Sequence, residues 1–168
     1  MKIVLKFGGT SLASPKDIRN VAKTITSFSK GNQIVVVCSA VDGVTDDLIT
    51  ISRLIEQRRK NNVVANLNEI IIKHRKLANQ TIKNSVIKKQ LLEKLNTDVS
   101  ELQELVRGLT LLKEVSARSL DYLISFGERL SDDLVSYTLQ DLKKKSTALN
   151  GKEVGIVTDS NFGESRPL

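Results

Sequence analysis

The first 38 residues constrain the fold most, because they predict a strand, a helix and a second strand in close succession. An apolar run at residues 2–7 stops at two consecutive glycines, as a strand does at its end. Ser14 and Pro15 are typical of a helix start, and one apolar stripe follows at spacings of three and four: Ile18, Val21, Ala22, Ile25 and Phe28. Residues 34–38 are apolar at consecutive positions, as in a strand covered on both faces. Such a unit predicts two parallel strands, a right-handed crossover and an α/β fold.

The middle of the chain, residues 45–145, predicts helices. It contains no proline and few glycines, and an apolar stripe runs through Val99, Leu102, Val106 and Leu109. We expect four or five helices with caps at Thr45, Thr97 and Ser116 and breaks near residues 61, 85, 96 and 108. The heptad pattern of a coiled coil fails after two turns. The sequence therefore predicts a helical insertion at about residues 46–145.

Strand character returns after the helices. Two short β-prone runs, residues 146–149 and 154–157, flank Asn150-Gly151 and predict adjacent strands or a hairpin. No covering helix follows, so we expect one face or edge of the sheet to be uncovered. The fold class that we predict is α/β: a partial three-layer αβα sandwich with a mainly parallel sheet, truncated within a larger domain.

Composition excludes several classes of protein. No apolar run reaches the roughly 20 residues of a membrane helix, and the start lacks the pattern of a signal peptide. The one cysteine, Cys38, favours a reducing compartment, and we expect a cytoplasmic protein. One cysteine and one histidine make no metal site, and His74, which lies among Lys and Arg residues, is predicted to be solvated.

The net charge of +7 leaves nucleic-acid binding as an alternative. However, the Lys and Arg residues lie mainly on predicted helix faces, and aromatic residues make up only 4% of the chain, so a stacking platform for bases is missing. We therefore expect no nucleic-acid partner and no membrane partner.

Three segments carry candidate reactive groups. The first loop, residues 6–11 (Lys-Phe-Gly-Gly-Thr-Ser), places Lys6 at the carboxyl end of a strand, where α/β folds bind ligands. An ammonium group there can bridge nucleotide phosphates, and two glycines let the backbone approach them. The spacing matches neither the P-loop nor the Rossmann fingerprint. A tight turn without a ligand is the alternative.

The second loop, residues 39–45 (Ser-Ala-Val-Asp-Gly-Val-Thr), follows the second strand and opens on the same edge of the sheet. Ser39 and Thr45 present hydroxyl groups there. Alternatively, Thr45 only caps the next helix.

The Glu128 segment, residues 125–131 (Ser-Phe-Gly-Glu-Arg-Leu-Ser), has a glycine inside a helical region, which suggests a break or a close approach. Glu128 could therefore point a carboxylate at the ammonium group of a ligand. Alternatively, Glu128 and Arg129 form an ordinary surface pair.

Together the three segments resemble the successive motifs of aspartate kinases, in the same order along the chain. Residues 158–163 (Thr-Asp-Ser-Asn-Phe-Gly) are similar to a fourth motif. The resemblance implies ATP-dependent phosphorylation of the side-chain carboxylate of L-aspartate, with Mg²⁺ held mainly through the ATP phosphates. It also implies that residues 1–168 are the amino-terminal, aspartate-binding part of the kinase domain, without the base-binding half or the regulatory domains.

The resemblance also implies roles for single residues. Lys6 would be catalytic and would contact the ATP phosphates together with Phe7, Gly8 and Gly9. The residues that would bind aspartate are Ser39, Thr45, Glu128 and Phe162. The family implies a homo-oligomer and the first step of lysine, threonine and methionine synthesis. We expect these 168 residues alone to be inactive, and a non-catalytic half domain that binds an amino acid or a partner is the alternative.

Overall fold

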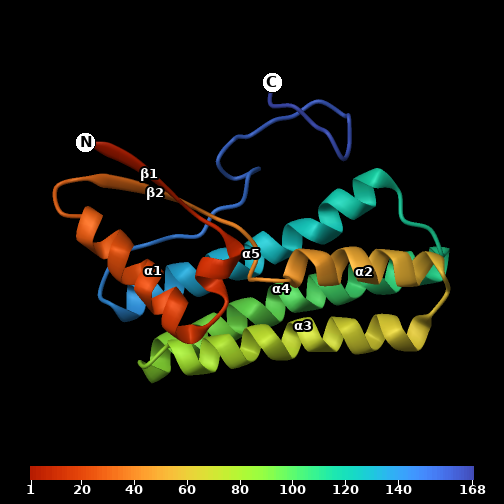
Figure 1. Ribbon diagram of the computed structural model, residues 1–168, viewed down its shortest axis with the longest axis horizontal. Coiled ribbons are helices and arrows are strands. Elements are labelled where there is room, and N and C mark those ends of the chain that lie inside the picture. Colours follow the sequence, from red (N-terminus) through yellow and green to blue (C-terminus); the bar gives the residue numbers. More distant parts are fainter.

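The computed structural model describes residues 1–168 and contains two strands and five α-helices (Figure 1). The elements in chain order are β1 (Lys2–Phe7), the short 3₁₀ helix η1 (Gly9–Leu12), α1 (Pro15–Phe28), β2 (Gln33–Cys38), α2 (Val44–Glu56), α3 (Lys60–Thr81), α4 (Ser85–Leu112) and α5 (Ala117–Asp141). The predicted α/β class with a parallel sheet and a large helical part is confirmed.

The strand–helix–strand unit forms as its sequence predicts. β1 and β2 are parallel, with Lys2 opposite Gln33 and Phe7 opposite Cys38. The Ser14 side chain caps α1 by accepting a hydrogen bond from the Asp17 amide at 3.2 Å. This unit fixes the direction of both strands, so their carboxyl ends, and the loops that follow them, lie at the same edge.

Only one face of the sheet is covered. Helices α1 and α5 lie on the same side of it in Figure 1 and pack against each other and β2, and alternate strand residues (Leu5, Phe7, Ile34 and Val36) join the core on that side. On the other face the exposed fractions of Val4, Val35 and Val37 are 68%, 56% and 44%. The prediction that residues 34–38 are covered on both faces is therefore wrong, whereas the predicted uncovered face is confirmed.

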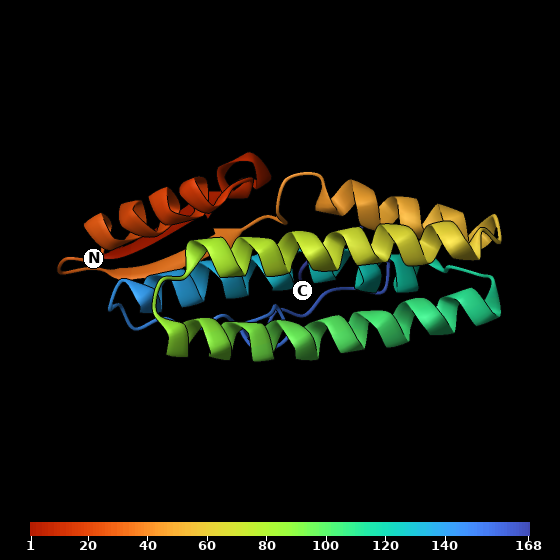
Figure 2. The same cartoon turned by 90° about the horizontal axis from the view of Figure 1, so that it is seen from below.

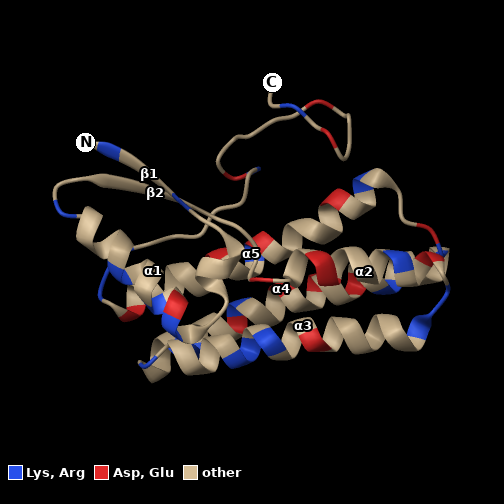
Figure 3. Ribbon diagram, in the orientation of Figure 1, with Lys and Arg blue, Asp and Glu red and all other residues tan.

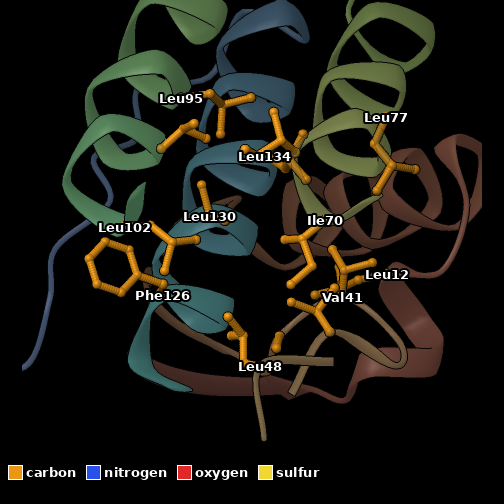
Figure 4. Close-up of a cluster of buried hydrophobic side chains, with 14 of the residues drawn as sticks. Leu12, Val41, Leu48, Ile70, Leu77, Leu95, Leu102, Phe126, Leu130 and Leu134 are labelled. Carbon is orange, nitrogen blue, oxygen red and sulfur yellow. The ribbon is translucent and has the colours of Figure 1, made fainter. Parts of the chain in front are cut away.

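Helices α2 to α5 form a long bundle, which Figure 2 shows from below. Its core contains fully buried leucines of α4 and α5, among them Leu102, Leu130 and Leu134, beside Phe126 (Figure 4). No helix of the chain is long and apolar enough to cross a membrane.

Several predicted helix boundaries are wrong. α4 continues through positions 96 and 108, and Thr97 lies inside it and caps nothing. Thr45 also caps nothing, because the helix-capping position of α2 is Gly43. Ser116 caps α5 as predicted, by accepting a hydrogen bond from the Ser119 amide at 3.2 Å.

His74 is buried, so the prediction of a solvated histidine is wrong. Only 1% of its surface is exposed, and its Nδ1 lies 2.8 Å from the Ile70 carbonyl one turn earlier in α3. Its Nε2 has no hydrogen-bond partner. Burial lowers the pKa of His74 to about 4. The neighbouring Arg75 and Lys76 are exposed, whereas the His74 side chain is buried in the bundle.

The two C-terminal strands predicted at residues 146–149 and 154–157 do not form. Residues 151–155 form consecutive turns, and the only β-bridge in this part of the chain joins Thr158 to Pro167. Short β-prone runs depend on neighbouring strands for their stability, and this segment makes no hydrogen-bonded ladder with β2. Val154, Ile156 and Val157 remain exposed.

Candidate functional site

The first and second loops are in direct contact at the carboxyl ends of β1 and β2. The Ser39 amide donates a hydrogen bond to the Phe7 carbonyl at 3.0 Å. A Cβ atom placed on Gly9 would lie 2.9 Å from the Ala40 carbonyl oxygen and 3.4 Å from the Asp42 Cα. Only glycine permits this approach, which explains one of the two glycines in the first loop.

The Glu128 segment is not a loop, because it lies inside α5, which runs without a break from Ala117 to Asp141. Its glycine serves close packing instead: a Cβ on Gly127 would lie 2.7 Å from the Ala40 Cβ. The Ser131 hydroxyl donates a hydrogen bond to the Ser39 carbonyl at 2.7 Å. The second loop therefore lies between the first loop and α5, and the structure brings the three predicted segments together.

The polar side chains predicted for the site make no contacts with protein groups. Lys6, Ser39, Thr45 and Glu128 have no side-chain hydrogen bond and no ion pair. Lys6 lies opposite Val37 on the exposed face of the sheet, and Glu128 is half-buried. All four side chains are therefore available to a ligand.

Phe7 and Phe162 are placed differently from the other predicted residues. The Phe7 side chain is half-buried on the covered face of the sheet, so its backbone is what reaches the first loop. The Phe162 ring lies 5.6 Å from the Arg118 guanidinium carbon, and the Gly163 amide donates to Asp121 at 2.7 Å. About 15 Å of helix separates Arg118 from Glu128, so Phe162 is not beside that carboxylate.

Arg129 is not paired with Glu128, so the surface-pair alternative is wrong. Its Nη2 donates to Asp98 and to Glu101 of α4, each at 2.6 Å, and its guanidinium carbon lies 4.3 Å from the centre of the Phe126 ring. Both acceptors lie 28 or more residues away in sequence. Arg129 is thus held by α4, which leaves the carboxylate of Glu128 without a cationic neighbour in the chain.

The contacts of Arg129 belong to a seam of charges between α4 and α5 that sequence reasoning missed. Lys94 bridges two buried carboxylates, Asp98 at 2.5 Å and Asp133 at 3.5 Å. Burial raises the pKa of Asp98, but hydrogen bonds from Lys94, Asp133 and Arg129 outweigh it and leave that pKa lowered. Burial and the adjacent Asp98 raise the pKa of Asp133. Only the tertiary packing brings these residues together.

Asp132 is a second acidic group near the site that the sequence reasoning did not single out. It lies one turn after Glu128 on α5 and next to Cys38, the last residue of β2. Burial, and then the charge of Glu128, raise the pKa of Asp132 to about 6. Burial, and then the charge of Asp132, raise the pKa of the Cys38 thiol to about 12, so this cysteine is an inert core residue. The spacing of four residues from Glu128 was a signal that could have found Asp132.

A cavity of about 470 Å³ lies elsewhere, along the free edge of β2 between α1, α5 and residues 144–149. Asp132 and Cys38 border it, but Lys6, Ser39 and Glu128 do not. The chain also contains no cluster of three or more His, Cys, Asp or Glu residues that could hold a metal ion. The candidate site is therefore the open junction of the two loops with α5.

Comparison with known proteins agrees with this geometry. A sequence model of the amino acid kinase family matches residues 1–167. The chain is 32% identical over 163 residues to chloroplastic aspartokinase 1 of Arabidopsis thaliana, and the match covers 95% of this chain and 27% of that protein. It is 31% identical over 160 residues to the aspartokinase of Candida albicans, with 90% of this chain and 28% of that protein covered.

Solved structures show the same fold. The E. coli aspartokinase III complex with lysine and aspartate superimposes with a TM-score of 0.84 at 23% identity, over 98% of this chain and 34% of that one. The E. coli aspartokinase III complex with aspartate and ADP gives the same TM-score. The chain spans about a quarter of the length of these curated aspartokinases. Taken with the convergence of its three motifs, these matches show that the chain belongs to the amino acid kinase family.

Proposed function

We propose that this chain is the aspartate-binding part of an aspartate kinase, which transfers the terminal phosphate of ATP to the side-chain carboxylate of L-aspartate to give 4-phospho-L-aspartate. One observation carries the proposal. The two loops and α5 meet at one end of the sheet and leave an ammonium group, two hydroxyl groups and a carboxylate unpaired there. These groups complement an amino acid that accepts a phosphoryl group.

Phosphoryl transfer needs positive charge and hydrogen-bond donors around the moving group. In the proposal Lys6 stabilises the negative charge that develops on the transferring phosphate. The backbone of Phe7, Gly8 and Gly9 approaches the same phosphates, since no side chain blocks the two glycines. Mg²⁺ would be held mainly through the ATP phosphates, and its chemistry would be to neutralise their charge.

The substrate would lie between the second loop and α5. Glu128 would bind the α-ammonium group of aspartate, because its half-buried carboxylate has no hydrogen bond or ion pair within the chain. Ser39 and Thr45 would donate hydrogen bonds to the carboxylates, and Thr45 lies in the first turn of α2, where the helix dipole favours negative charge. Phe162, which lies against Arg118, would line the outer rim of the pocket.

We further propose that these 168 residues are an amino-terminal part of the kinase domain, since they span about a quarter of the curated relatives. The segments that bind the nucleotide base, and the regulatory domains, would lie outside residues 1–168. These residues alone would then transfer no phosphate, and the whole homo-oligomeric enzyme would open lysine, threonine and methionine synthesis. The single buried thiol fits a reducing compartment such as the cytoplasm.

Calorimetric titration with L-aspartate tests the proposal. We expect binding to the unmodified chain and a loss of at least about tenfold in affinity for Glu128→Gln, because a charge-assisted hydrogen bond to the ammonium group is lost. The matched control is Glu104→Gln, an exposed glutamate without a partner on α4, which should bind as the unmodified chain does.

Succinate, which lacks the amino group, should bind equally to the unmodified chain and to Glu128→Gln. Unchanged aspartate affinity in Glu128→Gln would refute the assignment of the ammonium site. A coupled assay of ADP release tests whether the 168 residues alone transfer phosphate. Aspartate-dependent turnover by the 168 residues would show that they are a complete catalyst.

A further inference from the structure

Lys73 of α3 reaches out of the helical insertion to the second loop. Its Nζ donates a hydrogen bond to the Asp42 carbonyl oxygen at 2.5 Å, across 31 residues of sequence. Lys73 makes no ion pair, so this carbonyl is its one protein partner. Most other Lys and Arg residues of the insertion are exposed, and Figure 3 shows their positions along the helices.

The turn that Lys73 contacts has little else to hold it. Asp42 precedes Gly43, whose φ of 78° is in the left-handed region that favours glycine. Gly43 is also the capping position of α2 and has no side chain to cap it. The remaining local support is two backbone hydrogen bonds, from the Val44 amide to the Val41 carbonyl at 2.9 Å and from the Asp47 amide to the Gly43 carbonyl at 3.0 Å. The Lys73 ammonium group thus adds a polar anchor to this turn, by donating to the Asp42 carbonyl rather than by capping α2.

An apolar contact between α3 and the second loop supports the same turn. Val41 is 1% exposed and lies beside Ile70 and Leu12 in the core (Figure 4). Ile70 precedes Lys73 by three residues, so both side chains project from the same side of α3. One turn of α3 therefore supplies a buried apolar contact to Val41 and a charged hydrogen bond to the next residue of the loop.

The Asp42–Gly43 peptide also joins the first loop to the start of α2. Asp42 contacts the first loop at Gly9, and the chain enters α2 immediately after Gly43, two residues before Thr45. A rotation of this peptide would move the Thr45 hydroxyl and the first turn of α2. These are the groups to which the proposed function assigns the carboxylates of aspartate.

We propose that Lys73 is a positioning residue for substrate binding: it fixes the Asp42–Gly43 turn and thereby places Thr45 and the amino-terminal end of α2 for aspartate. The role of Lys73 in binding rests on the proposed function. The anchoring of the turn does not, because it can be measured without a ligand. The competing explanation is that Lys73 is an ordinary surface lysine whose contact contributes nothing.

Hydrogen exchange of the ligand-free chain tests the anchoring. Lys73→Met keeps most of the aliphatic stem and removes the donor. We expect the amides of Val44 and Asp47, which bond to Val41 and Gly43, to exchange about threefold to tenfold faster, because local opening of the turn becomes easier. Lys76→Met, an exposed lysine on the same helix without a partner, should leave these rates unchanged. Equal exchange in both variants would overturn the anchoring role.

Aspartate titration of the same variants tests the positioning. We expect Lys73→Met to bind about threefold to tenfold more weakly, because part of the ligand's binding energy is then used to order the turn. Lys73→Arg, which keeps a donor, should recover most of that affinity, and Lys76→Met should bind normally. Lys73→Leu, which also lacks a donor, provides a second variant if Lys73→Met does not fold.

The outcomes separate the two proposals. If the unmodified chain binds no aspartate, the proposed function fails, while hydrogen exchange still decides whether Lys73 anchors the turn. If the unmodified chain binds aspartate and Lys73→Met binds it equally well, the positioning role is wrong even where exchange is faster.

Discussion

The helical bundle and the two-stranded sheet differ in how completely they bury apolar side chains. In α4 and α5, Leu102, Leu130 and Leu134 have no exposed surface. In the sheet, the exposed fractions of Val4 and Val35 are 68% and 56%, and apolar residues after position 148 are similarly open. The bundle therefore contains the core that holds the chain together, while the sheet mainly sets the direction of the loops. The site lies between them and is attached to the bundle through Gly127, Ser131 and Lys73.

The largest effect on stability is expected from truncating a buried side chain of the bundle. Its absence would contradict the difference between the bundle and the sheet. Leu130→Ala should lower the free energy of unfolding by about 3 kcal/mol, because a fully buried side chain is lost and a cavity is left. Val35→Ala, on the open face of β2, should change it by less than about 0.5 kcal/mol. Urea unfolding followed by circular dichroism measures both, and similar losses would show that the sheet is as essential to stability as the bundle.

The charged seam of the bundle provides the next test. Asp98→Ala should cost about 2 kcal/mol, because it removes the buried partner that Arg129 and Lys94 share, while their remaining partners, Glu101 and Asp133, and their partial exposure limit the penalty. The control is Glu93→Gln, which removes an exposed pair with Lys89 at 3.9 Å and should change stability by less than about 0.5 kcal/mol. Equal values for the two variants would mean that the seam behaves as ordinary surface charge.

Acid should weaken the bundle through His74. Burial lowers the pKa of His74 to about 4 in the folded chain, whereas the unfolded chain binds this proton below about pH 6.5. The unfolded state therefore binds more protons as the pH falls through this range, and stability decreases by about 2 kcal/mol between about pH 7 and pH 4.5.

His74→Leu should lack this loss, and urea unfolding of both proteins at the two pH values measures the difference. The raised pKa of Asp133 acts in the opposite sense, because its folded form keeps a proton that the unfolded form has lost. That effect is present in both proteins and cancels. Parallel pH profiles for the two proteins would contradict the role of His74.

The smallest expected effect compares two helical glycines. Gly127→Ala should destabilise the chain by about 1 kcal/mol, because the new Cβ would lie 2.7 Å from the Ala40 Cβ and this overlap outweighs the better helix propensity. Gly108→Ala in α4 meets no atom within 4 Å and should stabilise the chain by about 0.5 to 1 kcal/mol. Thermal unfolding of both variants measures these shifts. A Gly127→Ala variant that is more stable than the unmodified chain would show that α5 does not pack closely against the second loop.

Local sequence signals predicted the elements that depend on local interactions. The caps at Ser14 and Ser116 and the apolar stripe of α4 are stabilised within a few residues, and the structure confirms them. The order of strand, helix, strand and insertion followed from periodicity and a topological rule. Of the site, the convergence of the two loops was predictable because parallel strands end at the same edge.

Apart from the wrong caps at Thr45 and Thr97, the main wrong predictions depend on contacts distant in sequence. The Lys and Arg residues around His74 could not reveal that this position of α3 faces the bundle core. The pairing of Arg129 with Asp98 spans 31 residues and follows from the packing of α4 on α5. The runs after position 145 are β-prone, but strand formation depends on a neighbour that sequence propensity does not specify. Gly127 predicted a close approach, but the residue it approaches, Ala40, became known only from the structure.

Ala40 lies between two glycines that are far apart in the sequence. The Ala40 carbonyl oxygen lies against Gly9, and the Ala40 Cβ lies against Gly127. Positions 9, 40 and 127, which are separated by 31 and 87 residues in the sequence, therefore pack closely together. Gly9 and Gly127 cannot be made smaller, so enlarging Ala40 cannot be compensated at either of them without moving the backbone. In an evolving or engineered chain we expect these three positions to remain small together, even where the surrounding helices change freely.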